Sequence, residues 1–340
     1  MTVSVCMIVK NEETSLRSAI ESVLSFADEI VIVDTGSGDR TKEIASEYTH
    51  LLFDFPMNFD FSEARNFSFS KCTMDYIYTA DADEVIDPEN QCKLAALKDA
   101  LTPEIEIVQM RYRNQQTDGT VYNFETEYRP KLFKRIRSFR WMDPVHEVID
   151  TGVRMINSEI EILHRQRESH AGRDFSYFER YAVPESSLSP RLHRLYAQEL
   201  FLAGTEEDFA RAYTYFEHTL HEETRSPDEI RQSQCVVTRC CHLRRDSTGL
   251  FKAALKNMVG KPSAEVCCEL GDFFYGEGDF EEAATWYYTA AFGAESELDV
   301  HSAGDLPLRC LSKCFDTLGD AGEAERYRRL ADEWNPQNPF

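Results

Sequence analysis

The sequence has 340 residues, of which 42% are hydrophobic, and a formal net charge of −23 at pH 7. This length predicts two domains, with enough apolar content for a buried core in each. The acidic balance argues against a general nucleic-acid or anionic-membrane surface, and no run approaches the roughly 18 apolar residues that a membrane-spanning helix requires.

The ten cysteines are scattered along the chain and form no Cys-x-x-Cys motif. This pattern disfavours zinc-thiolate and thioredoxin-type sites, and free thiols suit a reducing cytoplasm. Residues 1–9 lack a basic n-region and a small-residue cleavage site, so we interpret them as a buried strand and not as a signal peptide. We therefore expect a cytoplasmic protein.

The first fifty residues alternate between apolar runs and helical periodicity. Continuous apolar runs are typical of strands that are buried on both faces of a sheet. The alternation predicts an α/β domain with a parallel sheet and right-handed crossovers, whose ligands bind beyond the carboxyl ends of the strands. The predicted strands are 3–9, 29–33 and 51–53, and the predicted helices are 16–24, with Thr14 or Asn11 as its N-cap, and 40–47.

Acidic residues follow two of the predicted strands. Asp34 ends one strand, and the run Tyr76–Thr79 is followed by Asp81, Asp83 and Glu84. Alternate residues of an extended chain point to the same side, so the carboxylates of Asp81 and Asp83 should converge. A hard divalent cation such as Mg²⁺ or Mn²⁺ fits between them, because it takes oxygen ligands. The competing interpretation is an acidic turn that begins the next helix.

The turn Gly36-Ser37-Gly38 follows Asp34 and is rich in glycine. It matches neither the Gly-x-Gly-x-x-Gly dinucleotide fingerprint nor the phosphate-binding loop that ends in Gly-Lys-Ser/Thr. A dehydrogenase and a P-loop ATPase are thus disfavoured. Because the carboxylate precedes the glycines, Asp34 can accept a hydrogen bond from a nucleobase N–H or a ribose hydroxyl.

Two basic features follow. A helix capped by Ser62 is predicted to carry Arg65 in its first turn, either as the partner of a diphosphate or as an ordinary surface arginine. Residues 128–140 carry six basic residues and no acid, which predicts either a positive wall for phosphates or a solvated strand pair. Residues 105–113 are predicted as a strand, and residues 117–120 as a hairpin turn into 121–126.

Histidines and acids recur between the last apolar runs of this half. Residues 141–150 place Asp143 before a proline, and His146 beside Glu147. Proline favours an extended conformation for the residue before it, which would aim Asp143 away from the site. A later strand, 160–164, ends in His164, which could complete a metal site or lie at an exposed sheet edge.

From about residue 170 the strand signals stop, and helices rich in Ala, Leu and aromatic residues take over. Residues 269–290 have the spacing of a tetratricopeptide helix pair, with small residues that let the two helices approach. Residues 195–220 and 311–336 repeat this pattern more loosely. Such helices could recruit a peptide or another partner, form a homodimer interface, or only buttress the first domain.

Taken together, the motifs of residues 1–165 resemble the family 2 glycosyltransferases of the GT-A fold, in a subgroup that carries tetratricopeptide-like helices. The resemblance implies a GT-A catalytic domain over 1–168 and an α-helical domain over 169–340. The GT-A domain is expected to be a mixed sheet with helices on both faces. The matching motifs are Val9-Lys10-Asn11-Glu12, Val33-Asp34-Thr35-Gly36-Ser37, Ala64-Arg65-Asn66, Asp81-Ala82-Asp83-Glu84, Arg129-Pro130-Lys131-Leu132-Phe133 and Val145-His146-Glu147.

The resemblance also implies roles for individual residues. Asp34 is expected at the nucleobase, Asp81 at the ribose, and Asp83 with His164 at a Mn²⁺ or Mg²⁺ ion. Glu147 occupies the place of the catalytic base, although it follows a histidine where the family has another acid, so Asp143 competes for that role. The remaining residues expected in the nucleotide-sugar pocket are Val9, Asn11, Glu12, Arg65 and Ala82.

The function implied is inverting transfer of a sugar from a nucleotide-diphospho-sugar, expected to be UDP-linked, to a peptide, lipid-linked or saccharide acceptor. Two alternatives are a nucleotidyltransferase and a non-catalytic tetratricopeptide scaffold on a degenerate GT-A domain. A nucleotidyltransferase should show a Gly-rich basic loop near the first strand, which this sequence lacks. A silent scaffold would tolerate loss of the acids, yet Asp34, Asp81 and Asp83 are all present.

Overall fold

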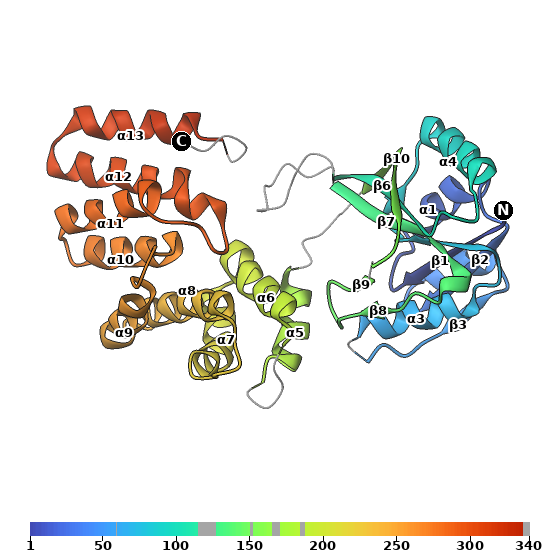
Figure 1. The fold of residues 1–340 in the computed structure, drawn as a ribbon, viewed down its shortest axis with the longest axis horizontal. Helices are drawn as coiled ribbons and strands as arrows, with labels where there is room; N and C mark the ends of the chain where they lie inside the picture. The colour runs from blue at the N-terminus through green and yellow to red at the C-terminus, as the bar shows by residue number, and fades with distance from the viewer. Residues whose placement is uncertain (59, 115–126, 150–151, 165–170, 184–187, 336–340) are drawn as a thin grey trace. The chain divides into compact units, whose positions relative to one another are not determined.

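A computed structural model describes the chain except for residues 59, 115–126, 150–151, 165–170, 184–187 and 336–340. It divides into two compact units, Met1–Ser169 and His170–Phe340 (Figure 1). The first unit contains the described strands of the sheets, and the second is helical. The predicted hairpin turn at 117–120 and the segment 121–126 lie outside the described residues.

The first unit is built on an eight-stranded mixed sheet, in the order β3-β2-β1-β4-β7-β6-β10-β5. Strands β3, β2, β1 and β4 are parallel, as the alternation of strands and helices predicts. Strand β7 then pairs antiparallel with both β4 and β6, and β10 runs parallel to β6. The strands are β1 Val3–Val9, β2 Glu29–Asp34, β3 Leu52–Asp54, β4 Tyr76–Ala80, β5 Glu84–Val85, β6 Ile107–Asn114, β7 Glu127–Lys134 and β10 Met155–His164; a separate pair joins β8 Trp141–Met142 to β9 Val148–Ile149.

Helices cover both faces of this sheet. Alternate residues of a strand point to opposite faces, and here both sets are apolar and need to be buried. Val5 and Met7 of β1 pack with Leu16 and Ile20 of α1, whereas Cys6 packs on the other face with Phe69 of α3. The expected α/β fold with helices on both faces is thus confirmed. The helices of this unit are α1 Leu16–Val23, α2 Thr41–Ser46, α3 Phe61–Lys71 and α4 Pro88–Ala100, and the 3-10 turn is Arg135–Arg137.

Two predicted helix caps differ from the observed ones. Asp60, not Ser62, caps α3, because its carboxylate accepts from the backbone N–H of Glu63 at 3.1 Å. Ser62 instead donates to Asp60 at 2.7 Å. Helix α1 starts after Ser15, which makes no side-chain capping bond, and not after Asn11 or Thr14. The N-terminus of each of these two helices has several Ser, Thr, Asp or Asn residues that could cap it, so residue type alone could not select the cap.

The second unit stacks helices in consecutive pairs (Figure 1). The pair predicted over 269–290 is confirmed as α10 Ala264–Gly276 and α11 Phe280–Phe292, joined by a turn in which Gly278 has φ +83°. None of the helices in the described parts of the chain is both long and apolar enough to cross a bilayer. The remaining elements are α5 Ala171–Tyr181, α6 Pro190–Ala203, α7 Glu206–Thr219, α8 Pro227–Leu243, α9 Ser247–Asn257, the 3-10 helix Val300–Ala303, α12 Asp305–Leu318 and α13 Ala321–Glu333.

The close approach of α10 and α11 depends on Gly271. A Cβ atom at this position would lie 2.5 Å from the ring of Tyr287, which is buried. We expect Gly271→Val to lower the free energy of unfolding by about 1–3 kcal/mol, because overpacking displaces that ring. Chemical denaturation of the full chain measures this change.

Gly276 provides the matched control. It lies at the end of the same helix, and a Cβ atom there would meet nothing within 4 Å. Gly276→Val should therefore leave the stability nearly unchanged. Equal effects of the two substitutions would contradict a packing role for Gly271.

Candidate functional site

The register of the sheet brings the predicted acids to one edge. Val9 at the end of β1 pairs with Asp34 at the end of β2, and Met7 pairs with Ala80 at the end of β4. Asp34 and Asp81 thus flank the carboxyl end of β1 from its two neighbouring strands. Adjacent strands lie about 4.8 Å apart, so the backbones at these two acids are separated by roughly 10 Å.

Asp34 is held by the turn that follows it. Its Oδ1 accepts from the backbone N–H groups of Gly36 and Ser37, both at 3.0 Å, and lies 3.6 Å from Nζ of Lys42. Burial opposes ionisation of Asp34, but the bonds from Ser37 and Gly36 and the charge of Lys42 outweigh it and lower the pKa. The other oxygen, Oδ2, is buried and has no hydrogen-bond partner. Asp34 is therefore an ionised acceptor with one unused oxygen.

The segment after β1 is tied to the same turn. Asn11 adopts φ +57° and accepts from the backbone N–H of Gly38 at 2.8 Å. The backbone N–H of Asn11 donates to Ser37 Oγ at 2.9 Å, and that of Glu12 donates to Thr41 Oγ1 at 2.7 Å. Asn11 and Glu12, both predicted site residues, thus brace the loop that holds Asp34.

Arg65 connects two candidate site acids. From α3 its guanidinium donates to Asp81 at 2.9 Å, to Thr79 at 2.9 Å, and to Glu147. The guanidinium also lies 5.0 Å from the ring of Trp141. Only 13% of the Arg65 side chain is exposed. Arg65 is therefore a buried cation that joins the end of β4 to the loop of Glu147, not an ordinary surface arginine.

Lys131 is a second buried cation at this edge, and sequence reasoning did not single it out. From β7 it forms an ion pair with Glu84 and lies 3.8 Å from Asp81. Burial opposes ionisation of Asp81, but Arg65 and Lys131 outweigh it and hold the pKa well below its usual range. Lys131 directly precedes the buried residues Leu132 and Phe133. Because a charged side chain is rarely buried without a partner, a lysine in such an apolar run indicates that a carboxylate lies close to it.

The basic segment 128–140 divides between two environments. Lys131 reaches the acids of the site, and Arg129 lies over the ring of Tyr112 with its guanidinium carbon 4.0 Å from the centroid. At the other end, Arg135 donates to the backbone of Met74 and Arg137 pairs with Glu106. Only the first part of the segment is placed to act on a ligand at the strand ends.

Asp83 and His164 meet beside these acids. Oδ2 of Asp83 lies 3.0 Å from Nε2 of His164, although 81 residues separate them. Ala82 between the two aspartates is 5% exposed, and the ring of Tyr112 lies 5.1 Å from that of His164. Adjacent ligands of an octahedral ion at about 2.1 Å are about 3 Å apart. A carboxylate and an imidazole at this spacing fit a Mn²⁺ or Mg²⁺ ion.

The loop of Glu147 and Asp143 packs against α3. The backbone carbonyl of Pro144 accepts from Phe61 at 2.9 Å, and Glu147 is held by Arg65. Asp143 has φ +70°, so the prediction of an extended residue before Pro144 is wrong. Tertiary contacts override the local preference here. Glu147 is joined to the acids of the site through Arg65.

Two hollows lie along α3, with volumes of about 590 and 330 Å³. Both are lined by Asn66, Ser138 and Phe139. None of the predicted site acids lines either hollow. The polar cluster at the strand ends is therefore a separate feature, defined by its charges and hydrogen bonds.

The first unit has relatives among known proteins. Residues 4–160 match the sequence profile described as glycosyl transferase family 2. A TPR repeat-containing protein of Synechococcus elongatus is 34% identical over 148 residues, which are 44% of this chain and 35% of the relative. An uncharacterized glycosyltransferase of Rickettsia typhi is 34% identical over 89 residues, covering 26% of this chain and 30% of the relative. The chain thus spans about a third of the length of these curated relatives.

Among solved structures, glucosyl-3-phosphoglycerate synthase from Mycobacterium tuberculosis, in complex with Mn²⁺, UDP-glucose and phosphoglyceric acid, aligns with a TM-score of 0.40 and 20% identity. The alignment covers 53% of this chain and 77% of the synthase. The sequence match over 4–160 covers most of the first unit, which holds the mixed sheet. Residues 4–160 form a family 2 glycosyltransferase domain, and the helical unit follows it.

Proposed function

We propose that this chain is a metal-dependent, inverting glycosyltransferase that uses a UDP-linked sugar donor. The observation that carries the proposal is the convergence at one sheet edge of three features: the unused buried oxygen of Asp34, the paired Asp81, and the Asp83–His164 contact. Each suits a different part of a nucleotide-diphospho-sugar. Together they follow the carboxyl ends of parallel strands, where such ligands bind.

The residues at this edge have distinct proposed roles. Oδ2 of Asp34 accepts from the imide N–H of a uracil, which satisfies an otherwise unpaired buried oxygen. Asp81, kept ionised by Arg65 and Lys131, accepts from a ribose hydroxyl. Val9, Asn11, Glu12 and Ala82 form or support the walls of this pocket.

Asp83 and His164 would hold the divalent cation, which supplies charge neutralisation for the leaving diphosphate. On the opposite face of the sugar, a carboxylate must take the proton of the acceptor as its bond to the anomeric carbon forms. We assign this role to Glu147, with Asp143 as the competitor. The acceptor is a peptide, a lipid-linked group or a glycan, and the helical unit is the part of the chain proposed to recruit it.

A thermal-shift screen of the full chain tests the donor assignment. UDP-sugars with Mn²⁺ should raise the unfolding temperature more than ADP- or GDP-sugars, because selective binding stabilises the native state by mass action, about 2.7 kcal/mol at one hundred times Kd. Asp83→Ala should lose the Mn²⁺-dependent part of this shift and abolish donor turnover.

Lys42→Met is the control for a change near the site that leaves the proposed metal ligands, Asp83 and His164, intact. The Lys42 side chain is 42% exposed and pairs with Asp34 and Asp54. The Mn²⁺ response of Lys42→Met should remain. Equal stabilisation by all nucleotide sugars, or a full Mn²⁺ response and full turnover in Asp83→Ala, would contradict the proposal.

A further inference from the structure

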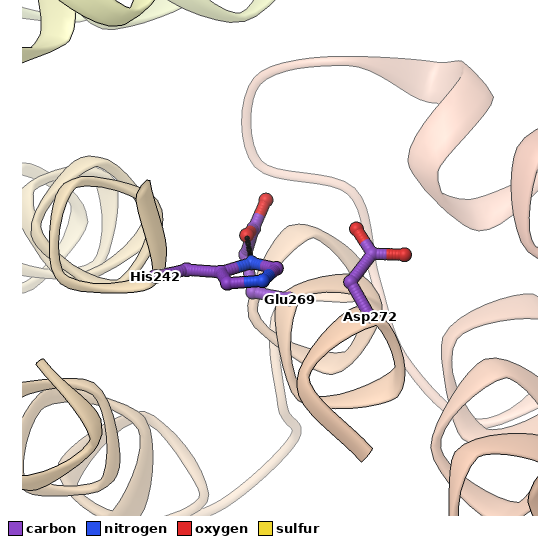
Figure 2. Close-up of side chains that lie close together, drawn as sticks. All are labelled: His242, Glu269 and Asp272. Carbon is purple, nitrogen blue, oxygen red and sulfur yellow. Dashed lines mark hydrogen bonds and ion pairs between the residues drawn. The ribbon is translucent and has the colours of Figure 1, made fainter. Parts of the chain in front are cut away.

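A second group of metal-ligand side chains lies in the helical unit, on two helices that pack side by side. His242 comes from α8, and Glu269 and Asp272 come from α10 (Figure 2). One ligand atom from each residue lies within 4.8 Å of the others. Glu269 and Asp272 are three residues apart, so they share one face of the helix. His242 Nδ1 approaches Glu269 Oε2 to 2.6 Å.

Each carboxylate of this cluster accepts, through one oxygen, a hydrogen bond from a side chain outside the cluster. Glu269 Oε1 accepts from Arg239 at 2.6 Å, while its Oε2 faces His242. Asp272 Oδ1 accepts from the hydroxyl of Tyr287, also at 2.6 Å. Metal-binding carboxylates are commonly anchored in this way by partners that do not touch the ion. Arg239 and Tyr287 therefore hold the two carboxylates in place.

Two carboxylates and one arginine contribute charge at this cluster. Only 2% of the Glu269 side chain is exposed. Arg239 offsets one carboxylate, so one negative charge is left when His242 is neutral. A divalent ion between the three side chains would face both carboxylates at once.

We propose that His242, Glu269 and Asp272 form a zinc site that joins α8 to α10. One imidazole and two carboxylates suit Zn²⁺, which takes nitrogen and oxygen ligands in tetrahedral geometry. Such ligands lie about 3.3 Å apart around the ion, a spacing bracketed by the 2.6 Å contact and the 4.8 Å limit of this cluster. Three protein ligands leave the fourth position to water. The ion would link two successive helix pairs of the unit.

Isothermal titration of the full chain with Zn²⁺ tests this site. The titration uses the Asp83→Ala background, because Asp83 and His164 could also bind the ion. We expect one Zn²⁺ per chain and a raised unfolding temperature. His242→Gln and Asp272→Asn should each bind Zn²⁺ at least tenfold more weakly, and Zn²⁺ should no longer raise their unfolding temperature. With Co²⁺ instead of Zn²⁺, the intact cluster should give the visible absorption of a tetrahedral site.

His218→Gln is the matched control. His218 is 47% exposed on α7, where its imidazole pairs with the carboxylate of Glu222 at 3.4 Å, so the titration should be unchanged. Circular dichroism shows whether each variant folds. If His242→Gln does not fold, Asp272→Asn tests the proposal instead, because its side chain can keep the hydrogen bond from Tyr287. Absence of Zn²⁺ binding, or the same binding in the cluster variants as in the parent, would overturn the proposal. Neither result bears on sugar transfer, because the Asp83–His164 pair is already removed.

Discussion

Arg65→Met is expected to lower the free energy of unfolding by about 3 kcal/mol and to abolish sugar transfer. The substitution keeps an apolar chain beside Trp141 but removes the cation that joins Asp81 to Glu147. Breaking a buried ion pair costs about 3–5 kcal/mol, because a charge stays buried without its partner. We expect the lower end of this range, since 32% of the Asp81 side chain is exposed and Lys131 remains nearby. Urea denaturation of the full chain and a donor-turnover assay measure the two effects.

Arg17→Met is the matched control for this substitution. Arg17 also pairs with a carboxylate, that of Glu47 at 2.7 Å, but 46% of its side chain is exposed. Exposed pairs contribute about 1 kcal/mol or less, so Arg17→Met should change stability little and leave turnover intact. A similarly small effect of Arg65→Met on both measurements would show that Arg65 neither supports the fold nor serves the site.

The pH dependence of the Arg65 effect has a definite sign. In the parent protein, the pKa of Asp81 is lowered on folding by Arg65 and Lys131, so its contribution to stability is present above the ordinary pKa of 3.8 and is lost as the pH falls below it. Without Arg65, ionised Asp81 contributes less to the free energy of unfolding at neutral pH. Acidification therefore removes less stability from Arg65→Met than from the parent. The stability difference between the parent and Arg65→Met should therefore narrow below about pH 4.

Local sequence patterns predict the sheet edge well. Asp34 and Asp81 each follow an apolar run, and the run alone indicates a buried strand that ends at the acid. The parallel order of β2, β1 and β4 then places both acids at the same edge, as the register shows. These predictions depend only on residues that are close together in the sequence, where hydrophobic periodicity is informative.

The pairings within the site could not be predicted in the same way. Arg65 and Glu147 are 82 residues apart, and Lys131 and Glu84 are 47 apart. Which cation meets which carboxylate depends on the packing of α3 against the sheet and on the position of β7 beside β4 within it, and not on spacing along the chain. Asp143 shows the opposite case, in which a sound local rule for the residue before proline is overridden by the fold.

Glu147→Gln is expected to lower the turnover of sugar transfer by about 10² or more, with nucleotide binding close to that of the parent. Glutamine has the same size and keeps an oxygen that can accept from Arg65, so the Arg65 contacts with Asp81 and Thr79 should persist. What it loses is the carboxylate that we propose takes the proton of the acceptor. Steady-state kinetics with varied acceptor, together with a titration of the nucleotide donor, separate these two effects.

Asp143→Asn is the paired test, because Asp143 lies on the same loop with φ +70° and competes for the role of base. If Glu147 is the base, Asp143→Asn should retain most of its turnover while Glu147→Gln does not. The reverse result would move the assignment to Asp143. Full turnover in both variants would show that neither carboxylate takes the proton. The acceptor would then be a nucleophile that ionises without help, such as a cysteine thiol, whose pKa of about 8.5 lies close enough to neutrality for a reactive thiolate fraction.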